Sequence, residues 1–206
     1  MEERVFFRAG DLQLEGLLAG PATAAGVVLC HPHPLYGGNM YNAVVEAVAV
    51  ALRAAGLATL RFNFRGVGKS GGKHARGEGE VEDALGAIAY LASYLKGEGP
   101  IGICGYSFGG MVALRAGRAD PRVAALAGIA PVVDPVDVMA GWAKPKLFVI
   151  GSRDEWVEPP QLARLVAAMP EPKELRYVEG ADHFFFGYEQ EVAQHVASFF
   201  TTCLPV

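Results

Sequence analysis

The motif Gly105-Tyr106-Ser107-Phe108-Gly109 constrains the fold of this chain more than any other stretch. The apolar run Ile101–Cys104 before it is strand-like, and the run Gly110–Ala119 after it is helix-like. A single serine therefore stands at a sharp turn between a strand and a helix, a strained backbone position that requires small neighbours. The two glycines allow the strand and the helix to approach without a Cβ clash. The pattern predicts a serine nucleophile.

The length and charge of the chain limit what else it can be. Its 206 residues suit one domain (1–206) with a sizeable core. A formal net charge of -4 argues against a nucleic-acid-binding protein, which usually carries a basic face. No apolar run reaches the roughly 20 residues of a membrane span, and the acidic start does not resemble a signal peptide. Three cysteines without framework spacing indicate reduced thiols and a cytoplasmic protein.

Strand-like and helix-like segments alternate along most of the sequence. The predicted strands are Val5–Arg8, Leu12–Leu18, Gly26–Cys30, Ala58–Phe64, Ile101–Cys104, Val123–Ala130, Lys146–Ile150 and Glu174–Val178. The predicted helices are Asn42–Ala55, Val81–Leu95, Gly110–Ala119, Gln161–Met169 and Glu189–Phe200. This alternation predicts an α/β fold, with a mostly parallel twisted sheet, helices on both of its faces and an antiparallel N-terminal hairpin.

Three loops at predicted carboxyl ends of strands carry the residues of a nucleophilic site. Ser107, Asp154 and His183 follow three different strands, and functional residues gather at this edge of parallel sheets. A serine hydroxyl needs a base to accept its proton, and His183 would be that base. Asp154 would hold the imidazole tautomer and stabilise the imidazolium. We therefore expect these three residues to be the catalytic ones.

Other acids and histidines are weaker candidates for the same roles. Asp182 adjoins His183, where side chains rarely orient each other well, whereas Glu155 and Glu158 could replace Asp154 if the loop differs. His195 falls on the last predicted helix. His74 lies in the glycine-rich loop between residues 65 and 79, where no strand end fixes it.

An oxyanion formed at the serine would need two backbone donors. Phe108 supplies one, since the first amides of a helix lack internal partners. The second should come from the loop after Cys30, in which the prolines have no N–H and the candidates are His33, Leu35 and Tyr36. We favour His33, with Leu35 next.

The histidines of that loop do not suggest a metal site. His31 and His33 are two apart in an extended segment and point to opposite sides, and no third ligand is evident. We expect no metal or organic cofactor, and a hydrogen bond from His31 that anchors the loop.

The chain resembles the α/β-hydrolase superfamily, and in particular a group of small, lidless bacterial hydrolases. The resemblance covers nearly the whole length and is carried by four segments. They are His31-Pro32-His33-Pro34-Leu35-Tyr36-Gly37-Gly38-Asn39-Met40, Arg61-Phe62-Asn63-Phe64-Arg65-Gly66-Val67-Gly68-Lys69-Ser70, Gly105-Tyr106-Ser107-Phe108-Gly109 and Gly180-Ala181-Asp182-His183-Phe184-Phe185. It implies serine esterase chemistry on a Ser107, Asp154 and His183 triad. Only about a dozen residues, Pro131–Ala143, stand where relatives often insert a cap.

An open site of this kind suits an accessible acyl ester or thioester, cleaved through an acyl-enzyme. Apolar side chains that would line it, as substrate-binding candidates, are Tyr36, Phe108, Met111, Trp142, Trp156, Phe184 and Phe185. Exposed apolar side chains near the site could equally form a homodimer surface.

Other functions remain open on the same scaffold. The triad also supports peptidases, acylaminoacyl hydrolases, acyltransferases and carbon–carbon hydrolases, and the chain could be a non-catalytic interaction protein. A peptidase would need an acid such as Glu155 or Glu158 to hold a substrate amine. A phosphate-binding loop ending in Gly68-Lys69-Ser70 would require glycine where the chain has Asn63.

Overall fold

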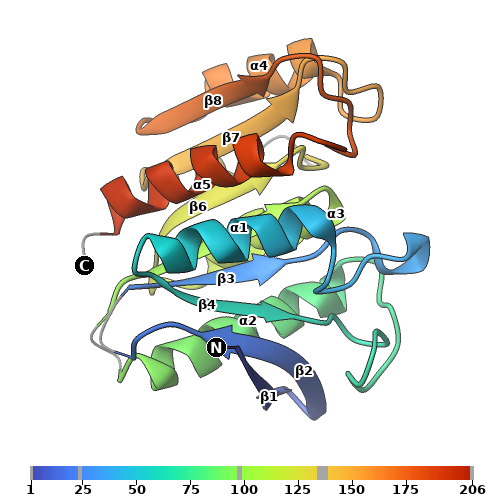
Figure 1. The fold of residues 1–206 in the computed structure, drawn as a ribbon, viewed down its shortest axis with the longest axis vertical. Coiled ribbons are helices and arrows are strands. Elements are labelled where there is room, and N and C mark those ends of the chain that lie inside the picture. The colour runs from blue at the N-terminus through green and yellow to red at the C-terminus, as the bar shows by residue number, and fades with distance from the viewer. Residues whose placement is uncertain (1, 23–24, 97–98, 134–138, 205–206) are drawn as a thin grey trace.

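The computed structural model describes residues 2–22, 25–96, 99–133 and 139–204, and its strands form one sheet (Figure 1). The strands are β1 (Glu3–Ala9), β2 (Leu12–Ala19), β3 (Gly26–Cys30), β4 (Ala58–Phe62), β5 (Ile101–Tyr106), β6 (Val123–Ile129), β7 (Lys146–Gly151) and β8 (Lys173–Val178). The helices are α1 (Ala43–Ala54), α2 (Glu78–Tyr94), α3 (Phe108–Ala119), α4 (Pro159–Ala168) and α5 (Glu189–Cys203), with a 3₁₀ turn, η1 (Pro34–Tyr36).

The order of the strands confirms the predicted architecture. Across the described residues the sheet has eight strands in the order β1-β2-β4-β3-β5-β6-β7-β8. The hairpin strands pair antiparallel, and β2 pairs antiparallel with β4. From β4 to β8 every pairing is parallel. The antiparallel strands therefore occupy one edge of a sheet that is otherwise parallel.

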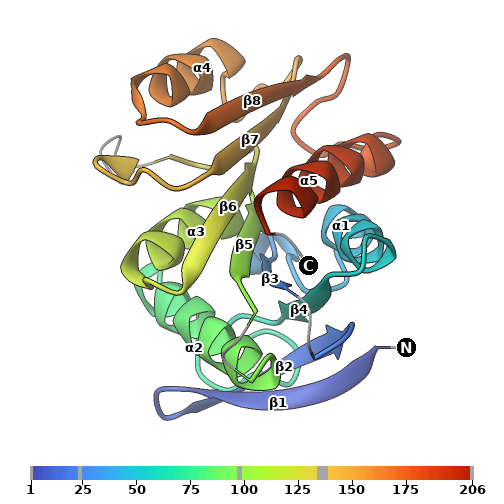
Figure 2. The ribbon, with the colours of Figure 1, turned by 90° about the vertical axis from the view of Figure 1, so that its left-hand side faces the viewer.

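Helices cover both faces of the sheet, as Figure 2 shows: α1 and α5 lie on one side, and α2, α3 and α4 on the other. Alternate residues of β3 serve the two cores. Val27 and Leu29 pack with the first pair of helices, whereas Val28 and Cys30 pack with the other three. Because both faces are buried, the strand reads as a continuous apolar run rather than an alternating one.

Several boundaries differ from the predicted ones, each for a local reason. Strand β5 extends to Tyr106 and α3 begins at Phe108, so one residue makes the turn. Helix α2 begins at Glu78 rather than Val81, because the Glu80 carboxylate accepts the backbone N–H of Gly77 and caps it.

Two further differences concern the segments beside the predicted site. Strand β4 ends at Phe62 rather than Phe64, because the backbone N–H of Phe64 donates to His31 Nε2. The loop after β3 contains the η1 turn, which was not predicted. Part of the predicted connection Pro131–Ala143, residues 134–138, lies outside the described residues.

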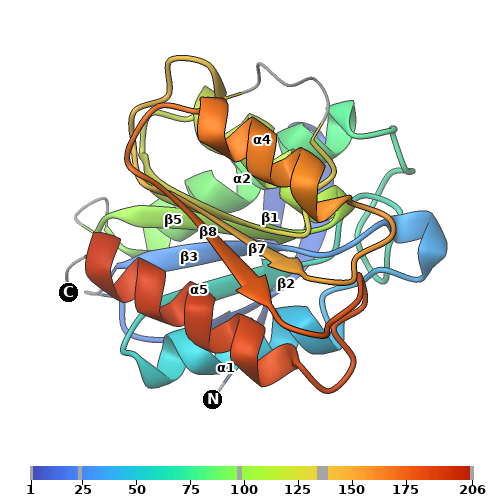
Figure 3. The ribbon, with the colours of Figure 1, turned by 90° about the horizontal axis from the view of Figure 1, so that it is seen from above.

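The parallel strands all end at one edge of the sheet, so the loops that follow them are brought together there. Figure 3 shows the loop after β3 projecting at this edge. Parallel α/β sheets bind ligands at the carboxyl ends of their strands. Within the described part of the chain, no helix has the length and apolar character needed to cross a membrane.

Candidate active site

Ser107 occupies a strained turn between β5 and α3. Its φ of 54° and ψ of -117° lie in a backbone region that residues other than glycine rarely adopt. Hydrogen bonds hold it there. The Ser107 N–H donates to the carbonyl of Ile129 on β6 at 2.8 Å, and the Ser107 carbonyl accepts the N–H of Gly110 at 2.9 Å. These hydrogen bonds keep Ser107 in its strained conformation at the end of β5.

The two motif glycines fill different steric needs. A Cβ on Gly105 would lie 2.0 Å from the Gly109 carbonyl oxygen, so this glycine allows α3 to fold back against β5. A Cβ on Gly109 would lie 2.3 Å from the His31 carbonyl oxygen. Gly109 therefore allows α3 to approach the end of β3, a contact that brings the loop after β3 close to the serine.

The three predicted catalytic side chains form one hydrogen-bonded chain. His183 Nε2 lies 3.0 Å from Ser107 Oγ, and His183 Nδ1 lies 2.8 Å from Asp154 Oδ2. Because Nδ1 faces a carboxylate, it carries the proton, which leaves Nε2 to accept the Ser107 hydroxyl. His183 and Asp154 are both buried. This arrangement can deprotonate a serine as it attacks an electrophilic carbon.

The Asp154 carboxylate is fixed in orientation by its own loop. Its Oδ1 accepts the backbone N–H groups of Trp156 and Val157, both at 2.8 Å. One oxygen thus orders the turn before α4 while the other faces His183. These bonds fix the orientation of the carboxylate and leave its second oxygen available to the imidazole.

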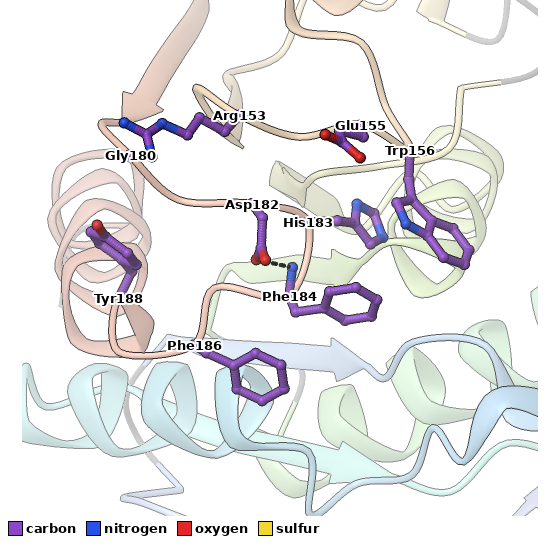
Figure 4. A pocket seen from close by; sticks show the side chains of 9 residues that line it. All are labelled: Arg153, Glu155, Trp156, Gly180, Asp182, His183, Phe184, Phe186 and Tyr188. Atoms are coloured by element: carbon purple, nitrogen blue, oxygen red, sulfur yellow. Dashed lines mark hydrogen bonds between the residues drawn. The ribbon is translucent and has the colours of Figure 1, made fainter.

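The weaker candidates do not take part in this chain. Asp182 Oδ1 accepts the N–H of Phe184 at 2.9 Å, a bond drawn in Figure 4, and Glu155 is exposed. Glu158 immediately precedes α4 and is exposed. His195 lies on α5 near Glu191, and His74 lies against Glu80.

Tyr106 contacts the main chain of His183, a contact that sequence reasoning did not predict. Its buried hydroxyl donates to the His183 carbonyl oxygen at 2.7 Å. Burial raises the pKa of Tyr106, and the nearby carboxylates of Asp154 and Asp182 raise it further, so the hydroxyl keeps its proton. The position lies inside the Gly-x-Ser-x-Gly motif, but the pattern accepts any residue there and gave no signal.

The loop after β3 is anchored by His31, as predicted. The fully buried ring donates from Nδ1 to the Pro32 carbonyl at 2.7 Å and accepts the Phe64 N–H at Nε2, 3.1 Å away. Burial lowers the pKa of His31 to about 4, although the bond to Pro32 opposes the shift. The neutral ring therefore ties the end of β3 to the end of β4.

The structure narrows the choice of oxyanion donors. Among the described residues, nothing accepts a hydrogen bond from the amides of Phe108 or His33. The Leu35 amide already donates to His33 Nδ1 at 3.2 Å, and that of Tyr36 donates to the His33 carbonyl at 3.1 Å. The expectation for Leu35 is thus corrected, because its N–H is occupied, and Phe108 and His33 remain.

Two cavities meet at His183. The first, of about 150 Å³, is lined by Pro32, His33, Tyr36, Gly37, Gly38, Asn42, Tyr106, Ser107, Trp156, His183 and Phe184. The second, of about 370 Å³, is lined by Arg153, Glu155, Trp156, Gly180, Asp182, His183, Phe184, Phe186 and Tyr188 (Figure 4). Trp156 and Phe184 line both, so these two rings separate a compartment beside the serine from a wider one with charged walls.

The predicted substrate-binding residues divide between these cavities and the core. Tyr36, Trp156 and Phe184 line a cavity. Trp142 does not line either, and this expectation is corrected. Its ring is buried under Lys146 at the amino end of β7, the opposite end of that strand from Asp154.

Three more of these residues, Phe108, Met111 and Phe185, also lie outside both cavities, and the Phe108 ring is buried in the core. Met111 packs against Gly77, where its Cε is 2.8 Å from the place a Cβ would take. Phe185 is buried in the core beneath α1 and α5.

Among the described residues, no group of three or more His, Cys, Asp or Glu side chains is placed to hold a metal ion.

The sequence of this chain is similar to known protein sequences. A family model described as "Serine aminopeptidase, S33" matches residues 21–144. An uncharacterized protein of Rickettsia prowazekii is 31% identical over 97% of this chain and 89% of its own length.

Solved structures are similar over nearly the whole chain. An α/β serine hydrolase homologue from Coxiella burnetii shares 34% identity with a TM-score of 0.86, covering 95% of this chain and 96% of that one. An α/β serine hydrolase without a lid from Xanthomonas campestris shares 26% identity with a TM-score of 0.87, covering 100% of this chain and 96% of that one. The chain is therefore a member of the serine aminopeptidase S33 family within the α/β-hydrolase superfamily.

Proposed function

We propose that this serine hydrolase cleaves carboxylic esters or thioesters through an acyl-enzyme on Ser107. The observation that carries the proposal is the chain Ser107 Oγ–His183 Nε2–Asp154, with contacts of 3.0 and 2.8 Å. Membership of a serine hydrolase family supports the same chemistry.

In the first half-reaction, Ser107 Oγ attacks the carbonyl carbon of the substrate while its proton moves to His183 Nε2. The carbonyl electron pair moves onto oxygen, and the amides of Phe108 and His33 donate to the resulting oxyanion. When the intermediate collapses, the bond to the leaving oxygen or sulfur breaks, and His183 gives its proton to the leaving group. Asp154 stabilises the imidazolium in between.

In the second half-reaction, water takes the place of the leaving group. His183 Nε2 accepts a proton from water as its oxygen attacks the acyl carbon, and the same two amides stabilise the second oxyanion. Collapse returns the proton to Ser107 Oγ and releases the carboxylic acid. Each oxyanion donor is worth about 10²–10³ in rate in such sites.

The two cavities suggest which substrates fit. The compartment beside Ser107 measures about 150 Å³, which suits a short acyl group. The wider one, about 370 Å³, begins at His183 and suits the leaving group, which must reach the imidazole to be protonated. We expect p-nitrophenyl acetate and butyrate to be cleaved faster than long-chain esters.

A peptidase acting on aminoacyl substrates is the second candidate. The matching family is described as serine aminopeptidase, and the Glu155 and Asp182 side chains line the wider cavity, where they could hold a substrate ammonium group. Activity on aminoacyl p-nitroanilides that exceeds activity on p-nitrophenyl esters would favour this candidate.

The test is hydrolysis of p-nitrophenyl esters together with labelling by a fluorophosphonate. Wild-type protein should show both, and Ser107→Ala should lose both. A Ser107→Ala variant that retains either would place the nucleophile elsewhere, and an inert wild-type protein would favour a non-catalytic role.

A further inference from the structure

A second histidine–carboxylate pair, His74 and Glu80, stands outside the Ser107–His183–Asp154 chain. Glu80 is fully buried in the first turn of α2. Its carboxylate accepts the backbone N–H of Ala75 at 2.9 Å and of Gly77 at 2.7 Å. These bonds give the buried carboxylate hydrogen-bond donors, and they join the end of the glycine-rich loop to the start of α2.

The His74 imidazole lies against this carboxylate. Its buried Nδ1 is 2.8 Å from Glu80 Oε1, but the geometry of this contact is not that of a hydrogen bond. No other described residue forms a hydrogen bond with Nδ1. A lone pair that close to a carboxylate oxygen would be repelled, so Nδ1 carries the proton. The attraction between the Nδ1–H dipole and the Glu80 carboxylate therefore holds the ring at its place in the glycine-rich loop.

The His74 ring packs on the two residues whose amides are free to bind an oxyanion. Its centroid lies 5.0 Å from that of His33 and 5.6 Å from that of Phe108. The His33 and Phe108 rings lie 4.7 Å apart. We name these three side chains the ring cluster. It joins the loop after β3, the start of α3 and the glycine-rich loop.

Backbone donors need firm support because their direction is set by the loop that carries them. The Phe108 amide belongs to a helix, but that of His33 lies in a loop outside regular structure. Within that loop the His33 side chain is held by one bond, from the Leu35 amide, by a ring contact with Tyr36 at 4.8 Å and by its packing in the ring cluster. A shift of the ring would turn the His33 N–H.

We propose that His74, held by Glu80, is a positioning residue that sets the separation of the two oxyanion donors. The inference rests on the proposed function, since it assumes that the His33 and Phe108 amides bind an oxyanion. The proposal gives the glycine-rich loop, residues 65–79, a role in the site through His74. His74 touches neither the substrate nor the reacting atoms and acts through the His33 and Phe108 rings.

The test compares His74→Ala and Glu80→Gln with His195→Ala as a matched control, because His195 lies on α5 outside this cluster. Loss of the cluster should lower kcat for a p-nitrophenyl ester by about 10- to 100-fold and change KM by less than about threefold, because an oxyanion exists only after attack. Inhibition by a trifluoromethyl ketone, whose serine adduct is an oxyanion, should weaken in proportion to kcat/KM.

His74→Phe is the second variant, and it serves as the test if His74→Ala does not fold. His74→Phe retains a ring of similar shape and should keep more activity than His74→Ala but less than wild type. Folded variants with wild-type kcat, or with a rate loss that leaves inhibition by the ketone unchanged, would overturn the inference. If wild-type protein neither hydrolyses esters nor reacts with fluorophosphonate, the proposed function itself fails, a result distinct from unaffected His74 variants.

Discussion

The indole of Trp156 lies flat against the imidazole of His183, with ring centroids 5.6 Å apart and ring planes 14° from parallel. The same residue donates its backbone N–H to Asp154. Trp156 thus contacts His183, the proposed base, through its side chain and Asp154 through its main chain. Its side chain is 66% exposed. Because the residue lines both cavities, the indole also forms part of the wall between them.

The first prediction concerns this stacked indole. Trp156→Ala leaves the main-chain bond to Asp154 in place but removes the ring that faces the imidazolium during catalysis. A cation–π contact at such a site is worth about 1 kcal/mol, so kcat/KM for a short ester should fall about fivefold. Trp156→Phe should keep most of the activity in the same steady-state assay.

Phe186→Ala is the matched control, because this exposed ring lines only the wider cavity. Because the wider cavity is proposed to hold the leaving group, the loss of kcat/KM in Phe186→Ala reports cavity contacts alone and should be smaller than the loss in Trp156→Ala. Equal losses in Trp156→Ala and Phe186→Ala would mean that the stacking on His183 has no special part.

The second prediction separates the two jobs of Asp154. In Asp154→Asn, the side-chain oxygen can still accept the N–H groups of Trp156 and Val157, whereas an amide donor would face His183 Nδ1. That favours the wrong imidazole tautomer, so kcat should fall about 10⁴-fold while the protein stays folded. Steady-state kinetics and urea unfolding measure the two effects.

Asp154→Ala should lose both activity and stability, since it removes the acceptor that orders the turn before α4. A stable Asp154→Asn protein with kcat within tenfold of wild type would show that another group orients His183.

The third prediction tests the support beneath the histidine. Tyr106→Phe removes the hydroxyl that donates to the His183 carbonyl and leaves that buried oxygen unsatisfied. The free energy of unfolding should drop by about 1–3 kcal/mol, measured by urea titration. Activity should drop more gently than in Asp154→Asn, because the side-chain contacts of His183 remain. An unchanged unfolding midpoint would show that water replaces the lost donor.

Local patterns predicted most of the fold. The helix predicted over Asn42–Ala55 is α1, with Asn42 accepting the N–H groups of Val44 and Val45 as its cap. Cap residue, apolar spacing and a following glycine are all readable along the chain. The places of Ser107, Asp154 and His183 in the fold were predictable in the same way, because each lies in the segment that follows a strand whose position is evident from its apolar run.

Contacts between distant segments were not predictable in this way. The bond from Tyr106 to the His183 carbonyl joins residues that are 77 positions apart, and nothing in either neighbourhood specifies it. The ring cluster depends on how the loop holding His74 folds back, which the buried Glu80 decides. The prediction for Trp142 was wrong for a different reason. An aromatic residue in a loop can pack in the core or line a cavity, and the residue type alone does not distinguish the two.

The fourth prediction uses the buried histidine that anchors the loop after β3. Burial lowers the pKa of His31 to about 4, whereas in the unfolded chain it should lie near 6.5. Between these values the unfolded state binds more protons, so the free energy of unfolding decreases as pH falls from about 6.5 towards 4. This histidine should therefore cost about 2 kcal/mol of stability between pH 7 and pH 5. Urea unfolding of wild type and His31→Gln at both pH values isolates it, because glutamine can keep both hydrogen bonds without titrating. The control His195→Gln, at a half-buried position on α5, should retain the wild-type decrease. If His31→Gln shows the same decrease as wild type, other groups cause it.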